Sequence, residues 1–217
     1  MTKLHPEQHP SEQQAADRLY ARGLVLEYIT VGYNVLEAFV SIFFGAISNS
    51  IALVGFGLDS IVESLSGMVL IWRLRKHGSM TREEEAAVEK KAMKFVAVTF
   101  FILGLYVMFE SVKKLVTGEQ PDPSLPGIII ACASIVVMPI LAYNKYRIGK
   151  RIGSKALVAD SKETSVCFIL SLALLLGLGM NQLFGVWQAD PVVGLFIVFF
   201  LVREGREVWC EAHEREE

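Results

Sequence analysis

Two pairs of side chains that can bind a metal ion occur within stretches apolar enough to span a membrane. Asp59 and Glu63 form the first pair, and Glu163 and Cys167 form the second. Residues four apart on an α-helix lie about 40° apart around the axis and about 6 Å apart along it, so each pair shares one face. A carboxylate at membrane depth is costly unless it is protonated, paired or bound to a cation. Two such helices in contact would present four ligands to one ion.

Asp160 lies on the same predicted helix face as the second pair, because it precedes Glu163 by three residues and Cys167 by seven. It could be a further metal ligand. Alternatively, Asp160 and the nearby Lys162 mark the aqueous end of this helix, and Cys167 is a small buried residue. The sequence leaves these alternatives open.

Two other acids lie in the first apolar stretch. Glu37 is deep within it and has no evident basic partner, so we expect it to line the path of the ion or to carry a proton. Glu27 is closer to the predicted membrane boundary, and we interpret it as an interfacial residue without a role in the site. We expect the interiors of the apolar stretches to lack Lys and Arg apart from Lys162. An exchangeable cation or a proton is therefore the predicted partner of Asp59 and Glu63.

The composition predicts an all-α, polytopic membrane protein. Apolar residues make up 53% of the 217 residues, and the mean hydropathy is positive. The near-neutral net charge of −2 argues against a nucleic-acid partner. An activated nucleophile, an HExxH pair and a cofactor motif are not evident, so we expect neither an enzyme nor a cofactor-dependent protein. Six predicted spans cover residues 24–46, 51–73, 92–116, 126–146, 156–178 and 190–203.

The loops between these spans differ in charge. Basic residues gather in two loops: Arg73, Arg75, Lys76, Arg82, Lys90, Lys91 and Lys94 in one, and Lys145, Arg147, Lys150, Arg151 and Lys155 in the other. The three alternate connections lack Lys and Arg, so the positive-inside rule places both termini in the cytoplasm. The predicted organisation is an N-terminal tail over 1–22, a transport domain over 23–203 and a short tail over 204–217. We expect a multi-pass protein of a bacterial inner membrane.

Three segments together resemble the cation diffusion facilitator family. They are Ser50-Ile51-Ala52-Leu53-Val54-Gly55-Phe56-Gly57-Leu58-Asp59-Ser60-Ile61-Val62-Glu63-Ser64, Ala156-Leu157-Val158-Ala159-Asp160-Ser161-Lys162-Glu163, and Ala189-Asp190-Pro191. The resemblance covers nearly the whole chain. It implies six spans, with a metal site made from paired ligands on the second and fifth helices.

The resemblance carries over to Asp59 and Glu63 on the second helix, and to Glu163 and Cys167 on the fifth. Glu163 stands where the family usually has histidine, and Asp160 could replace it as a ligand. Most members continue into a cytoplasmic metal-binding domain, so this chain resembles the shorter subgroup that lacks it. Members are generally dimeric. A homodimer would then be held through the membrane region, with the glycine-rich second and sixth spans as candidate surfaces.

By resemblance, the protein would export a divalent metal in exchange for protons by alternating access. Carboxylate and thiol ligands must lose protons to bind metal, which leads to the same expectation from chemistry alone. Oxygen ligands with one thiolate favour zinc, or cadmium, over magnesium and calcium, while iron, manganese and cobalt are alternatives. The rival hypothesis is a non-transporting membrane metal sensor or interaction protein that uses the same residues.

Overall fold

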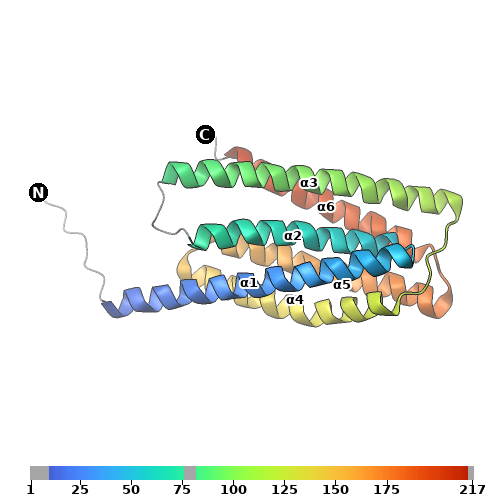
Figure 1. Cartoon of the computed structure of the whole chain (residues 1–217), viewed down its shortest axis with the longest axis horizontal. Helices are drawn as coiled ribbons and strands as arrows, with labels where there is room; N and C mark the ends of the chain where they lie inside the picture. Colours follow the sequence, from blue (N-terminus) through green and yellow to red (C-terminus); the bar gives the residue numbers. More distant parts are fainter. Residues whose placement is uncertain (1–9, 76–81, 215–217) are drawn as a thin grey trace, which may run out of the picture.

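Six long helices run along one another in a single bundle, shown in Figure 1. The structure is a computed structural model that describes residues 10–75 and 82–214. Every regular element in these ranges is α-helical. The helices are α1 (Pro10–Ile47), α2 (Ile51–Arg75), α3 (Arg82–Thr117), α4 (Leu125–Ile152), α5 (Lys155–Phe184) and α6 (Ala189–Glu214). The predicted all-α fold is confirmed.

The predicted domain boundaries at 22/23 and 203/204 fall inside helices. The first helix already begins at Pro10 and α6 continues to Glu214, so both tails are partly helical extensions of the bundle. Residues 1–9 and 215–217 of the predicted tails lie outside the described residues, as do residues 76–81 of the first basic loop.

Five of the helices contain stretches long and apolar enough to cross a membrane: Arg18–Ile47, Ile51–Trp72, Lys94–Thr117, Leu125–Ile152 and Ala156–Phe184. Large apolar side chains such as Phe39, Ile102 and Val136 are exposed on the outside of the bundle. Such an exterior suits lipid better than water. The protein is therefore a multi-pass membrane protein. The apolar part of α6 ends at Val202 and charged residues follow, so a sixth crossing stays a prediction.

The bundle consists of three closely packed helix pairs, α1 with α2, α4 with α5, and α3 with α6. Helix α2 also contacts α3, α5 and α6, so it is the central helix of the bundle (Figure 1), and α5 packs against it and against α6. The fully buried side chains include Phe56 and Leu53 of α2 and Leu170 and Leu174 of α5. The two helices that carry the predicted ligand pairs are therefore neighbours.

Short connections determine which ends of the helices meet. Gly153 and Ser154 join α4 to α5: Gly153 adopts a left-handed conformation with φ 68°, and the Ser154 hydroxyl accepts a hydrogen bond from the Leu157 amide at 3.3 Å. The two helices consequently form an antiparallel hairpin. This turn lies at the same end of the bundle as the start of α1 and the end of α6 (Figure 1), the end to which the basic loops belong.

The glycines of α2 and α6 allow close packing within the chain. A Cβ atom at Gly57 would lie 2.7 Å from Ile42 of α1, and one at Gly67 would lie 2.7 Å from Val31. On α6, a Cβ atom at Gly205 would lie 2.9 Å from Phe100 of α3. These faces are thus filled by neighbouring helices of the same chain. A dimer surface on these helices stays a prediction, and the glycines named here are already in close contact with α1 and α3 of the same chain.

Candidate functional site

The acids of α2 lie inside the bundle. Asp59 is 8% exposed and Glu63 is 6% exposed. Glu63 Oε1 accepts a hydrogen bond of 2.8 Å from the Thr164 hydroxyl of α5, which ties α2 and α5 together. Its other oxygen, Oε2, is buried and has no hydrogen-bond partner among the described residues. Glu63 therefore has one oxygen anchored and one free to bind an ion.

The second pair faces the same region from α5. Cys167 is buried, and its sulfur lies 3.8 Å from Glu37 Oε2, the oxygen that Ser60 of α2 also contacts. Glu163 is half-buried, and Glu63 lies within electrostatic range of it. The structure thus places all four predicted ligands around the contact between α2 and α5.

These four side chains are near one another without forming a compact cage. Within the part of the chain that the structure describes, no three His, Cys, Asp or Glu side chains approach closely enough to hold a metal ion. Carboxylates repel one another when no cation lies between them. Metal binding would therefore require Asp59, Glu63, Glu163 and Cys167 to converge by movement of α2 against α5 or by rotamer changes.

Glu37 of α1 extends this group. Its Oε2 accepts a hydrogen bond of 2.7 Å from Ser60 of α2 and lies 3.8 Å from the Cys167 sulfur, while Oε1 accepts from Ser134 of α4. Tyr33 contacts the same Ser134 hydroxyl at 2.9 Å. Glu37 of α1 therefore contacts α2 and α4 through serine hydroxyl groups and α5 through the thiol of Cys167, a candidate ligand. Its predicted part in an ion or proton path stays a prediction.

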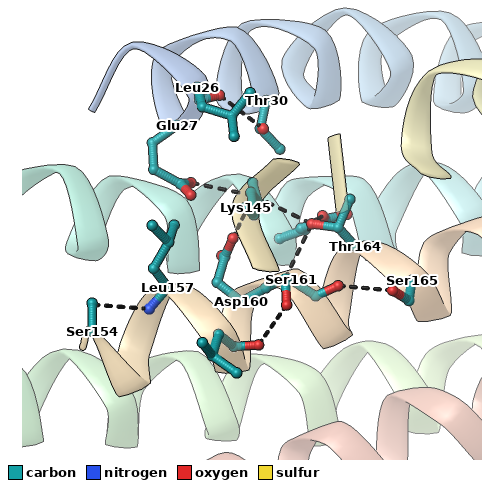
Figure 2. A network of polar contacts seen from close by, with 12 residues as sticks. Leu26, Glu27, Thr30, Lys145, Ser154, Leu157, Asp160, Ser161, Thr164 and Ser165 are labelled. Atoms are coloured by element: carbon teal, nitrogen blue, oxygen red, sulfur yellow. Dashed lines mark hydrogen bonds and ion pairs between the residues drawn. The ribbon is translucent and has the colours of Figure 1, made fainter. Parts of the chain in front are cut away.

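A buried lysine contradicts the expectation that the interiors of the apolar stretches lack Lys and Arg apart from Lys162. Lys145, assigned above to a basic loop, lies on α4 and is fully buried. Its ammonium forms an ion pair with Asp160 of α5 and a second one, at 3.3 Å, with Glu27 Oε2 of α1. Figure 2 shows Lys145 between these two carboxylates. Glu27, interpreted as interfacial, is likewise fully buried.

The helical period of α4 could have revealed the buried lysine. The buried face of this helix includes Met138, Leu141 and Gly149. Lys145 lies on that same face, because it follows Leu141 by four residues and precedes Gly149 by four. Counting hydropathy alone placed Lys145 at a membrane boundary, while the spacing of its buried neighbours indicates that it points inward.

The acids divide into two groups by their partners. Glu27 and Asp160 share the ammonium of Lys145. Among the described residues, several other buried or half-buried acids form no ion pair with Lys or Arg: Glu37, Asp59, Glu63, Glu163, Asp190 and Glu204. An excess of carboxylates over basic groups favours the entry of a cation.

A separate network lies at the opposite end of the bundle. Asp190, at the start of α6, accepts hydrogen bonds from the Ser50 hydroxyl and, at 2.9 Å, from the Ile51 amide at the start of α2. Lys114 of α3 donates to the backbone oxygen and, at 2.8 Å, to the side-chain oxygen of Asn49. Ser50 and Asp190 belong to the segments that carry the family resemblance. In the structure they fix helix ends and do not face the candidate site.

Comparison with known proteins identifies the family of the chain. The cation efflux transmembrane domain matches residues 28–213. An uncharacterized transporter of Synechocystis sp. is 28% identical over 76% of this chain, and 55% of its own length is covered. A "probable cation efflux system protein" of Mycobacterium tuberculosis is 25% identical over 88% of this chain, with 59% of its length covered.

A vertebrate protein is similar in sequence over most of this chain. Transmembrane protein 163 of Xenopus laevis is 21% identical over 85% of this chain, with 65% of its own length covered. The chain thus spans 55% to 65% of the length of these three relatives. The match to the domain extends from within α1 to within α6, and includes every helix that contributes to the candidate site. The chain belongs to the cation efflux family.

Proposed function

We propose that this protein moves a divalent transition-metal ion, zinc first and cadmium as well, out of the cytoplasm in exchange for protons. Asp59, Glu63, Glu163 and Cys167 would bind the ion. The observation that carries the proposal is the group of acids where α2 meets α5 that form no ion pair with Lys or Arg among the described residues. Membership of the cation efflux family supports the transport of a cation in general.

The choice of metal follows from the ligand atoms. Three carboxylates and one thiolate offer oxygen and sulfur ligands, which zinc accepts in four-coordinate geometry. A soft thiolate disfavours magnesium and calcium. Iron, manganese and cobalt tolerate a ligand set rich in carboxylates, so we place them after zinc and cadmium.

Exchange for protons follows from competition for the same atoms. A carboxylate or thiol binds a metal after it has lost its proton, so metal binding releases protons and proton binding releases metal. A site that opens alternately to the two sides would therefore couple the two fluxes. The acids converge on the ion in the bound state and separate on its release.

The proposal also includes the orientation in the membrane, the type of membrane and the oligomeric state. We place both termini in the cytoplasm, because the start of α1 and the end of α6 lie with the basic loops. We further propose a bacterial inner membrane and a homodimer. The dimer surface would use apolar residues outside the bundle, since the glycine faces of α2 and α6 are filled from within the chain.

The test is metal-dependent proton flux in proteoliposomes that contain a pH-sensitive dye. Zn²⁺, Cd²⁺, Fe²⁺, Mn²⁺ and Mg²⁺ are compared in the wild type, in Asp59→Ala and in the control Glu119→Ala, which removes an exposed carboxylate in the α3–α4 connection. We expect zinc to drive proton flux in the wild type and the control, and Asp59→Ala to abolish it. Wild-type flux in Asp59→Ala would remove Asp59 from the site.

The same experiment separates transport from sensing. A membrane metal sensor would bind zinc, with binding lost in Asp59→Ala, yet would show no flux of metal or protons in sealed vesicles. Metal binding without flux for every ion tested would contradict the proposed antiport and favour the sensor.

A further inference from the structure

Lys145 contacts the candidate site through a neutral residue. Its ammonium lies 3.2 Å from the Thr164 hydroxyl, in addition to its ion pairs with Asp160 and Glu27. The Thr164 hydroxyl lies 2.8 Å from Glu63 Oε1. One continuous chain of hydrogen bonds therefore runs from Lys145 through Thr164 to a predicted ligand, and part of it is visible in Figure 2.

The direction of these hydrogen bonds is determined by chemistry. An ammonium group can only donate, so the Thr164 oxygen must accept from Lys145. Its one hydroxyl proton then remains available for an acceptor, and both Glu63 Oε1 and, at 3.1 Å, the backbone oxygen of Asp160 are in reach. Of these two, the carboxylate forms the stronger hydrogen bond because it carries a charge. Lys145 thus favours the hydroxyl orientation that anchors Glu63.

Anchoring one oxygen of Glu63 has a consequence for the other. Oε2 is buried and has no hydrogen-bond partner among the described residues. Burying a carboxylate oxygen that has no hydrogen-bond donor is unfavourable unless a ligand, such as a cation, binds to it. The chain of hydrogen bonds therefore holds Glu63 with a single oxygen available to an ion.

Lys145 also determines which acids an incoming cation can use. The ammonium group of Lys145 already forms ion pairs with both Asp160 and Glu27. A metal ion would have to displace a buried ammonium to reach either. Among the described residues, Glu163 forms no ion pair with Lys or Arg, and Glu63 is linked to Lys145 only through the Thr164 hydroxyl. This difference bears on whether Asp160 or Glu163 supplies the ligand from α5.

We propose that Lys145 is a positioning residue of the metal site: it orients Glu63 through Thr164 and excludes Asp160 from coordination, so that Glu163 and Cys167 are the ligands from α5. This inference rests on the proposed function. A positioning residue of this kind acts without touching the metal, and loss of such a partner typically lowers metal affinity about 10- to 100-fold.

The first test removes the middle group, the Thr164 hydroxyl, from the chain of hydrogen bonds between Lys145 and Glu63. Thr164→Val keeps the side-chain volume and the ion pairs of Lys145 but removes the hydroxyl, while Thr164→Ser keeps the hydroxyl. We expect Thr164→Val to lower Zn²⁺ affinity at least about tenfold by titration calorimetry, and Thr164→Ser to retain it. Wild-type affinity in Thr164→Val, or an equal loss in Thr164→Ser, would overturn the proposal. The unfolding temperature of each variant separates lost affinity from lost folding.

The second test asks whether Lys145 acts through Thr164. Lys145→Met alone leaves two buried carboxylates unpaired, so it is combined with Glu27→Gln and Asp160→Asn. We expect this triple variant to lose Zn²⁺ affinity about as much as Thr164→Val, and the addition of Thr164→Val to cause little further loss. Interacting residues show such non-additivity. Fully additive losses would show that Lys145 does not act through Thr164.

The third test addresses the ligands of α5. Asp160→Asn is expected to retain Zn²⁺ binding, whereas Glu163→Gln is expected to lose it. The reverse result would make Asp160 the ligand and overturn the inference while leaving metal transport intact. A wild-type protein that neither binds nor transports any of the five metals would instead refute the proposed function.

Discussion

Two buried lysines, one near each end of the bundle, perform different tasks. Lys145 is fully buried and Lys114 is 3% exposed. The first binds two carboxylates from two other helices and contacts the candidate site through Thr164. The second binds only neutral oxygens among the described residues, both from Asn49 in the turn between α1 and α2. The two lysines are therefore both buried but differ in the charge of their partners, and of the two only Lys145 is linked to the candidate site.

The largest expected effect follows from removing the charge at Lys145. Lys145→Met leaves Asp160 and Glu27 buried without a counter-ion, which we expect to lower the free energy of unfolding by about 3–5 kcal/mol. Unfolding of the reconstituted protein by denaturant measures this change. Adding Glu27→Gln and Asp160→Asn should restore most of it. If Lys145→Met unfolds like the wild type, the lysine is not the counter-ion of these acids.

At the other end, Asp190→Ala should have a smaller effect. It removes the acceptor for the Ser50 hydroxyl and the Ile51 amide at the start of α2. We expect a loss of about 1–2 kcal/mol, the usual range for an N-terminal cap. Zn²⁺ affinity should remain at the wild-type value, since Asp190 lies away from the candidate ligands. A loss of affinity without a loss of stability would show that the two ends of the bundle are coupled.

The smallest effects concern two neighbouring lysines of α3. Lys114→Met removes two hydrogen bonds to the exposed Asn49, whose oxygens water can then solvate, so we expect a loss of about 1 kcal/mol. Lys113→Met removes an exposed ion pair with Glu110 at 3.2 Å, and we expect no measurable change. Equal destabilisation by the two variants in the same unfolding measurement would contradict this order.

The sequence predicted the helical fold well, because apolar runs of membrane length are a strong signal. It also placed Asp59 and Glu63 on one face of the second span, and Glu163 and Cys167 on one face of the fifth. These pairs rest on spacing within a helix, which is a local property. The ligand roles themselves remain predictions.

The buried network was missed because it depends on packing between helices. Glu27, Lys145 and Asp160 belong to three different helices, and hydropathy assigns each to the aqueous end of its own span. Their burial follows from how α1 packs against α4 and how α4 packs against α5. Thr164 gave no sequence signal, since its importance comes from lying between Lys145 and Glu63.

The short connection through Gly153 and Ser154 has a consequence for how the chain enters the bilayer. Lys145 and Asp160 lie on consecutive helices of one hairpin, so their ion pair can form as soon as α4 and α5 have been synthesised. A lone lysine or aspartate in a membrane helix makes insertion less favourable, by about 2.5–3.5 kcal/mol at the centre of the helix and by less toward its ends, where these two residues lie. If the two helices insert together, each charge enters lipid already neutralised by the other. The residue pair that organises the mature site would thereby also ease its own biogenesis.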